Sequence, residues 1–278
     1  MLQIKSVKQI LSNIKETQAD REKQYKYLHQ HPELSMQETH TAQAIIDILT
    51  KDGIEAKRVG KTGVVAIIKN GEGPIVAMRA DIDALPVTEN SGKDYASTVT
   101  TQDENGKTVG VSHACGHDFH IASLLGSLQA FNNHKEAWHG TYIGVFQPGE
   151  ETAQGAKSLV ENGITRIIPK PDVYLGQHAL AAIPAGTVGI KSGAFLTTAS
   201  SIRVHIFGKG SHGSMPELSV DPVVLASSIV LKLQTIVSRE VAAKDYAIVT
   251  VGAINAGSKS NIIPDDAELL INTRTYSE

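Results

Sequence analysis

Two neighbouring stretches decide the fold class of this 278-residue chain: DFHIASLLGSLQAFN at residues 118–132 and TYIGVF at residues 141–146. The first is long enough for a buried helix. The second is a short, almost wholly apolar run, typical of a strand covered on both faces. Similar apolar strands and helical segments alternate on either side of this pair. The alternation predicts a sheet with helices on both faces, and therefore the α/β class.

The remaining elements of this first region follow from apolar patterning and from breaks at glycine and proline. A capping box made by Ser35 and Glu38 is expected to start one helix, and Gly53 ends it. Strands are predicted at 54–59, 64–69, 75–80 and 173–176, with a weaker one at 106–111, and helices at 4–29, 35–49 and 155–162.

The pattern changes after Ile190. SIRVHIF at 201–207 alternates apolar and polar residues with period two, as a half-exposed strand does. A long helix at 222–241 and strands at 247–254 and 267–275 complete a β-α-β-β order. This order predicts a small α+β domain with one open sheet face. We place the boundary between 188 and 198, which gives domains at 1–190 and 191–278.

Composition narrows the classes of partner and the compartment. The net charge is −3, with both signs interspersed, so nucleic acid and anionic membranes are not expected partners. The single cysteine excludes an internal disulfide and favours a reducing compartment. The N-terminus is charged and lacks the apolar core of a signal peptide, and no apolar run approaches the roughly 20 residues of a membrane span. We therefore expect a soluble, cytoplasmic protein.

Four polar clusters follow strands of the first region. Ligands of open α/β sheets bind outside the carboxyl ends of the strands, so these clusters are expected to converge on one site. They are RADIDALP at 79–86, HACGHDFH at 113–120, QPGEE at 147–151 and QH at 177–178.

Cys115 lies among histidines just ahead of a predicted helix. A lone cysteine is more often a small buried hydrophobe than a metal ligand. Here the helix N-terminus is expected to favour the thiolate, which is the form that binds metal. One cysteine excludes a four-cysteine zinc site but leaves a mixed sulfur, nitrogen and oxygen site open.

The acidic residues allow a division of labour. Adjacent acids such as Glu150 and Glu151 usually occupy a solvated turn, but here they follow a buried strand. One carboxylate can then bind metal while the other accepts a proton from water. Asp81 and Asp83 point to one side of an extended chain, where one can orient a histidine or cap a helix. His178 ends a strand, where a histidine is more often simply hydrogen-bonded.

Together these clusters resemble the metallopeptidase family that contains aminoacylases, hippurate hydrolases, plant auxin-conjugate hydrolases and succinyl-diaminopimelate desuccinylase. The resemblance is to the branch with a cysteine as bridging ligand, and it covers nearly the whole chain. It rests on LHQHPELSMQE at 28–38, MRADIDALPV at 78–87, SHACGHDFH at 112–120, QPGEE at 147–151 and GKGSHGSMPE at 208–217.

The resemblance implies a fold and a set of roles. The fold is a three-layer catalytic domain with a mixed sheet, at 1–190, and an inserted, smaller α+β lid and dimerisation domain at 191–278. The implied roles are Cys115, His117, Glu151 and His178 as metal ligands, Glu150 as general base, Asp83 as support of the metal centre, His212 as the histidine that polarises the scissile carbonyl, and Asn261 and Arg274 as substrate-binding residues.

The implied activity is hydrolysis of the amide bond of N-acyl amino acids or small peptides. It would use two divalent metal ions, zinc or manganese, with cobalt or nickel as substitutes in vitro. The expected partners are a small-molecule substrate and a second copy of the chain, bound through the lid domain. The family has a further histidine ligand in a C-terminal segment without a counterpart here, so we expect a truncated chain with little activity.

Two alternatives stay open at this stage. A thiol hydrolase would use Cys115 as nucleophile and His113 or His117 as base. It leaves the pair of glutamates and His178 without a role. A non-catalytic remnant would act only as a dimerising or metal-binding module.

Overall fold

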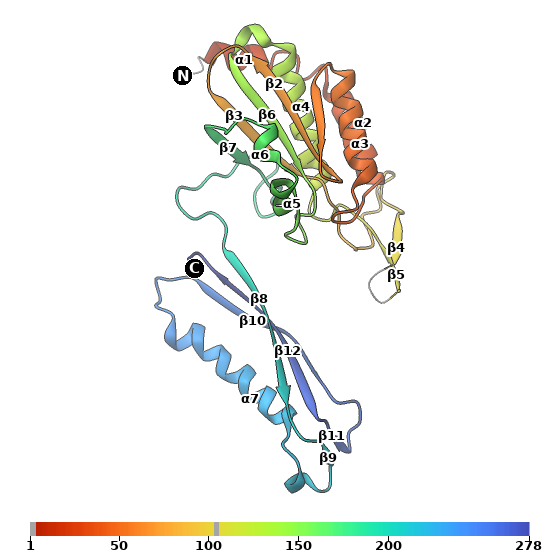
Figure 1. Cartoon of the computed structure of the whole chain (residues 1–278), viewed down its shortest axis with the longest axis vertical. Helices are drawn as coiled ribbons and strands as arrows, with labels where there is room; N and C mark the ends of the chain where they lie inside the picture. Colours follow the sequence, from red (N-terminus) through yellow and green to blue (C-terminus); the bar gives the residue numbers. More distant parts are fainter. Residues whose placement is uncertain (1–3, 103–105, 278) are drawn as a thin grey trace. The chain divides into compact units, whose positions relative to one another are not determined.

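The computed structural model describes residues 4–102 and 106–277, which divide into two compact units (Figure 1). The first unit is Met1–Ala182 and the second is Ile183–Glu278. The division falls in a stretch without helix or strand, a few residues before the boundary at 190/191 expected from the sequence. Each unit is described by itself.

A five-stranded sheet forms the centre of the first unit, with the order β1-β2-β6-β3-β7. The pairs β1/β2 and β2/β6 are antiparallel, whereas β6/β3 and β3/β7 are parallel. The sheet is therefore mixed, as the resemblance implied. Its strands are β1 (Glu55–Val59), β2 (Gly63–Asn70), β3 (Ile75–Asp81), β6 (Gly140–Gln147) and β7 (Val173–Gly176).

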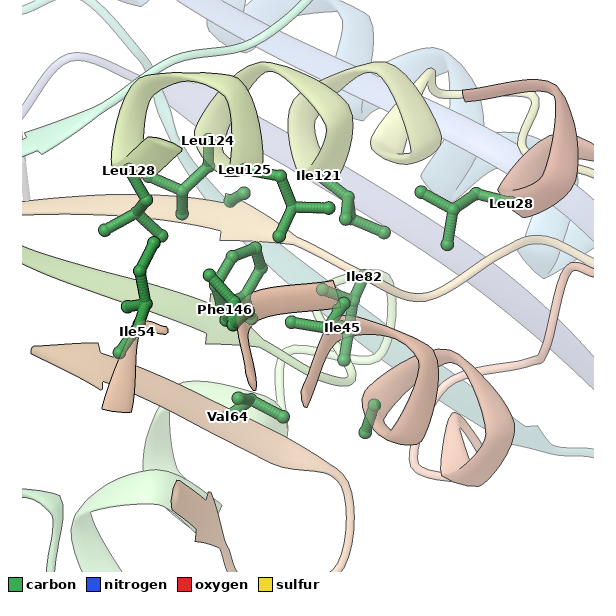
Figure 2. Close-up of a cluster of buried hydrophobic side chains, with 14 of the residues drawn as sticks. Leu28, Ile45, Ile54, Val64, Ile82, Ile121, Leu124, Leu125, Leu128 and Phe146 are labelled. Carbon is green, nitrogen blue, oxygen red and sulfur yellow. The ribbon is translucent and has the colours of Figure 1, made fainter. Parts of the chain in front are cut away.

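Helices cover both faces of this sheet, which confirms the α/β class. Successive residues of β6 alternate between two cores: Tyr142 and Phe146 face one, and Ile143 and Val145 face the other. The larger core includes Leu128 of α4 (Figure 2). Helices α2 (Gln18–Gln30), α3 (Thr39–Lys51) and α4 (His117–Asn133) contribute to the first core, and α5 (Gly155–Glu161) and α6 (Ile164–Ile167) to the second.

Two local expectations for the first unit were wrong, and a third was confirmed over a shorter span. The helix predicted at 4–29 is two helices, α1 (Ile4–Ile10) and α2, separated by turns. The weak strand at 106–111 is β5 (Thr108–Gly110), which pairs with β4 (Thr100–Gln102) outside the main sheet.

The predicted capping box is the second wrong expectation. Helix α3 begins at Thr39, and the Glu33 carboxylate accepts the backbone N–H groups of His40 and Thr41 at 3.2 and 2.8 Å. Glu33 thus satisfies the free donors at the helix start. Ser35 Oγ instead donates to Asp83, and Glu38 Oε1 accepts the backbone N–H groups of Met36 and of the distant Gly149.

The second unit is a three-stranded antiparallel sheet with one helix. Its order is β10-β12-β8, and α7 (Pro222–Thr235) packs on it through a core that includes Ala226, Leu269 and Ile271. Asp221 caps α7 by accepting the backbone N–H of Val223 at 2.8 Å. The strands and remaining turns are β8 (Thr198–Phe207), β9 (Ser211–His212), β10 (Ala247–Ala256), β11 (Ile262–Ile263), β12 (Asp266–Thr275) and a π-helical turn at Ile236–Glu240.

The described residues contain one helix, Pro222–Glu240, that is long and apolar enough by length and composition to cross a membrane. It spans 19 residues with a mean hydropathy of 1.2, although the sequence reading expected no such run. Helices of packed domains pass the same test, and α7 packs on the sheet of its own unit. One such helix is therefore weak grounds for a membrane span.

Candidate metal centre

The topology of the first unit brings the predicted polar clusters to one edge of the sheet. Strands β3, β6 and β7 run parallel, so their carboxyl ends lie on the same side. Asp83 follows β3, Glu150 and Glu151 follow β6, and His178 follows β7. His117 is the first residue of α4, directly after Gly116, whose φ of 77° places the backbone in the left-handed region that favours glycine.

Three groups of side chains place donor atoms within 4.8 Å of one another. All three contain His117, which is buried. The groups are Cys115, His117 and His178; His117, Glu150 and Glu151; and Asp81, His117 and His120. The three other predicted metal ligands and the predicted base therefore lie around the imidazole of His117.

Hydrogen bonds fix which nitrogen of His117 faces the site. Its Nδ1 lies 2.9 Å from the backbone oxygen of Asp83 and 3.2 Å from the Asp83 carboxylate, so it donates there. Nε2 is left with its lone pair, 3.8 Å from Glu151 Oε1 and 4.0 Å from Glu150 Oε2. A carboxylate that orients a histidine in this way is a recurrent second partner of metal ligands.

Asp83 is itself held by three donors. In addition to His117, Ser35 Oγ donates to it at 2.7 Å and the backbone N–H of Glu151 at 3.0 Å. Burial works against the charged form, but these bonds overcome it and lower the pKa of Asp83 to about 2. Asp83 therefore stays ionised and links the ends of β3 and β6 to α4.

Several buried polar atoms at this place have no hydrogen-bond partner among the described residues. They include His117 Nε2, Glu151 Oε1 and Asp81 Oδ2. An unpartnered buried polar atom is costly, so such a cluster needs an explanation, and an ion is a common one. Sulfur, imidazole nitrogen and carboxylate oxygen are a suitable donor set for zinc or manganese. The residues present therefore fit a bound cation.

Cys115 differs from the expectation in one respect. Burial, a hydrogen bond to Glu151 and the nearby negative charges of Glu150 and Asp83 raise the pKa of the thiol to about 12. The carboxylates outweigh the helix N-terminus that was expected to favour the thiolate. A divalent cation beside the sulfur would reverse this balance, because a coordinating thiol loses its proton.

The raised pKa also argues against the thiol-hydrolase alternative, since a nucleophilic cysteine needs a lowered pKa. Neither candidate base lowers the pKa of this thiol. His113 is buried, and burial lowers its pKa to about 4, while both ring nitrogens lack a hydrogen-bond partner among the described residues. His117 Nδ1 is committed to Asp83.

Glu150 is more exposed than its neighbour Glu151 and belongs to the same loop. Burial raises the pKa of Glu150, and the charges of Asp81 and Glu151 raise it further. A carboxylate with a raised pKa is a better proton acceptor near neutrality.

The remaining predicted residues lie in the second unit. His212 in β9 pairs with Ile262, next to Asn261, whose backbone oxygen accepts the N–H of Gly213 at 2.8 Å. Arg274 lies near the end of β12 opposite Ala199, at the start of β8. His212 follows the other end of β8. A strand rises about 3.3 Å per residue, so β8 alone extends roughly 25 Å from Ala199, opposite Arg274, to Phe207, and His212 follows that far end.

Sequence reasoning gave no role to His120, and it gave Ser35 only the role of a helix cap. His120 is fully buried, and Ser35 donates to Asp83. The sequence could have indicated His120, because it lies three residues after His117 and therefore on the same face of the predicted helix.

Comparison with known proteins agrees with this geometry. The chain is 39% identical over 254 residues to N-acetylcysteine deacetylase of Bacillus subtilis (strain 168), covering 90% of this chain and 64% of that protein. It is 36% identical to an N-acyl-L-amino acid amidohydrolase of Geobacillus stearothermophilus, covering 91% and 66%. The chain thus spans under two thirds of the length of both relatives.

A solved structure with the same fold is that of the YXEP protein of Bacillus subtilis, a dinuclear metal-binding peptidase from the M20 family. It superposes with a TM-score of 0.74 at 35% identity, covering 95% of this chain and 66% of that one. Residues 77–269 match the model of peptidase family M20/M25/M40, a span that includes the donors at the sheet edge and most of the second unit. With this match over more than half of its length, the chain belongs to peptidase family M20/M25/M40.

Proposed function

We propose that the protein is a metal-dependent amidohydrolase that cleaves the amide bond of N-acyl amino acids, with N-acetyl and N-benzoyl amino acids or small peptides as substrates. The observation that carries this proposal is the cluster of unpartnered buried donors around His117, with the proton acceptor Glu150 beside it. Relatives named for N-acetylcysteine and N-acyl-L-amino acids support the substrate class.

Two divalent metal ions are proposed as the cofactor. Cys115 would bind both, and His117, His178 and Glu151 would complete the ligands that this chain supplies. Bound there, the ions would lower the pKa of a water molecule and polarise the amide carbonyl. Zinc suits the cysteine and the histidines, and manganese suits the histidines and the carboxylate.

Glu150 is proposed to move the proton. Its carboxylate accepts a proton from the attacking water as the water oxygen bonds to the amide carbon. It then delivers the same proton to the amide nitrogen as the C–N bond breaks, which yields an amine and a carboxylic acid, and the acid releases its remaining proton to solvent. Asp83 keeps the imidazole of His117 in one orientation throughout.

The second unit is proposed to bind the substrate. His212 would donate to the oxyanion, a role worth about 10²–10³ in rate for a single donor, and Asn261 would assist it. Arg274 would hold the carboxylate of the amino acid in a bidentate contact. Because Arg274 lies beside the start of β8 and His212 lies beyond the other end of that strand, in β9, a single small substrate cannot contact both in one subunit. We therefore propose a homodimer in which His212 serves the partner's site.

The test is hydrolysis of a panel of N-acetyl, N-benzoyl and N-succinyl amino acids with added Zn²⁺, Mn²⁺, Co²⁺ or Ni²⁺. Turnover that a chelator abolishes and metal restores, and that Glu150→Gln lacks while retaining its metal, supports the proposal. Turnover that survives complete removal of metal would refute it.

A further inference from the structure

His120 is a histidine of the metal centre whose role the proposed mechanism leaves open. It lies one turn after His117 on α4 and is fully buried. Its ring stacks on that of His117, with centroids 5.4 Å apart and planes at 29°. It also meets the ring of His178 edge to face at 4.7 Å. His120 thus contacts two proposed ligands and shares one of the three donor groups.

A backbone amide decides the tautomer of His120. The N–H of Ala179 lies 2.8 Å from His120 Nε2. A backbone N–H only donates, so Nε2 must carry the lone pair, and in the neutral imidazole the proton sits on Nδ1. A nitrogen that carries a proton cannot bind a metal. This removes His120 Nδ1 from the list of possible metal ligands, although it lies close to Asp81 and His117.

The proton on Nδ1 faces a carboxylate. His120 Nδ1 is 3.8 Å from Asp81 Oδ2, and neither atom has a hydrogen-bond partner among the described residues. Asp81 is buried and forms an ion pair with Arg79. A small shift of the ring toward Asp81 would complete a charge-assisted hydrogen bond for two buried polar atoms.

The backbone of Ala179 connects His120 to the ligand His178. While its N–H donates to His120, the oxygen of Ala179 lies 2.7 Å from His178 Nδ1. A carbonyl only accepts, so His178 Nδ1 is the donor there and its Nε2 keeps the lone pair. The two imidazoles are therefore joined through one residue, and this arrangement leaves His178 Nε2 free to bind metal.

We propose that His120 is a positioning residue which, as the neutral Nδ1–H tautomer, anchors Ala179 and Asp81 and so fixes the position and tautomer of His178. It donates no atom to a metal. This inference rests on the proposed metal centre, but it does not require amide hydrolysis. Loss of such an outer partner typically costs 10–100-fold in metal affinity.

Three substitutions separate the two contacts of the ring. In His120→Gln the amide oxygen can replace Nε2 as acceptor for Ala179, and in His120→Asn the amide nitrogen can replace Nδ1 as donor to Asp81. His120→Phe keeps the ring shape and loses both. His134→Phe is the matched control, because His134 caps the far end of α4 and contacts Asn13 instead.

The measurements are Co²⁺ affinity by competition with a chelator, hydrogen exchange of the Ala179 amide, and the tautomer of His120 by ¹⁵N NMR. His120→Phe is expected to lose roughly 10–100-fold in affinity and to exchange Ala179 faster, with His120→Gln recovering most of both. His134→Phe should match the wild type. These readouts hold or fail whether or not the protein hydrolyses amides.

Two results would overturn the proposal. One is an Nε2–H tautomer of His120 in the wild-type protein, which can be measured even if a variant fails to fold. The other is a folded His120→Phe variant with wild-type Co²⁺ affinity and wild-type exchange at Ala179.

Discussion

Glu38 offers the sharpest test of how distant segments hold the loop that carries Glu150 and Glu151. It is completely buried, and its Oε1 accepts two backbone N–H groups, from Met36 at 2.8 Å and from Gly149 at 2.7 Å. Gly149 directly precedes Glu150, and its φ of 53° lies in the left-handed region. Burial raises the pKa of Glu38. Glu38 therefore anchors, through its hydrogen bond to Gly149, the start of the loop that carries the proposed base Glu150.

The perturbation is Glu38→Leu, compared with Glu38→Gln. Leucine leaves the buried N–H of Gly149 and the part-buried N–H of Met36 without an acceptor, at about 1–3 kcal/mol for each buried donor, or up to about 6 kcal/mol together. Removal of a buried carboxyl offsets part of this cost. Glutamine keeps an acceptor oxygen and resembles the protonated acid. We expect the leucine variant to be less stable than the glutamine variant by at least about 2 kcal/mol, or roughly 4–8 °C in Tm.

Trp138 makes the assay specific to the first unit. It is the only tryptophan of the chain, it packs against the larger core, and its Nε1 donates to the Phe131 oxygen at 2.9 Å. Its fluorescence on heating or in urea therefore reports unfolding of this unit. The exposed Glu161 supplies a control pair, because leucine and glutamine there should differ little. Equal stability of the two Glu38 variants would refute the anchoring role.

Three further predictions concern metal, pH and assembly. Cys115→Ala should lose bound metal by elemental analysis, and unchanged stoichiometry in a folded variant would contradict a bridging thiolate. Burial lowers the pKa of His29, but hydrogen bonds to Glu89 and Asp118 outweigh burial and raise that pKa above its ordinary 6.5. Protonated His29 therefore contributes its full stabilisation below pH 6.5, and this contribution is lost as the pH rises through the raised pKa. Denaturation of His29→Gln should accordingly differ most from the wild type near pH 6 and least near pH 9. Light scattering should show a dimer, and mixing Glu150→Gln with His212→Ala subunits should recover about a quarter of wild-type turnover if His212 serves the partner's site. No recovery in verified hybrids would place His212 in its own subunit's site.

The sequence was sufficient for the fold class because its signals are local. Apolar runs such as 141–146 predict a strand wherever they lie in the sheet, and donors placed directly after strands predict convergence once the strands are parallel. The fold class required no knowledge of which strands are neighbours.

The errors arise where a distant group competes with a local pattern. Ser35 and Glu38 have the spacing of a capping box, but Asp83 and Gly149 bind them instead. The helix N-terminus near Cys115 predicts a thiolate, whereas carboxylates from other loops raise its pKa. These partners and carboxylates lie far from Ser35, Glu38 and Cys115 in the sequence, so a prediction from local sequence patterns cannot include them.

In the proposed metal centre, the backbone decides which imidazole nitrogens are left free to bind a metal. Histidines 117, 120 and 178 have similar side chains and their rings contact one another. Asp83 O and Ala179 O each accept from Nδ1 and leave Nε2 free, on His117 and His178 respectively. The Ala179 N–H donates to His120 and so leaves a proton on Nδ1, toward a carboxylate. Two imidazoles are thereby prepared to bind a cation and the third to orient them. This division follows from which peptide group each ring meets, and a motif search cannot supply it.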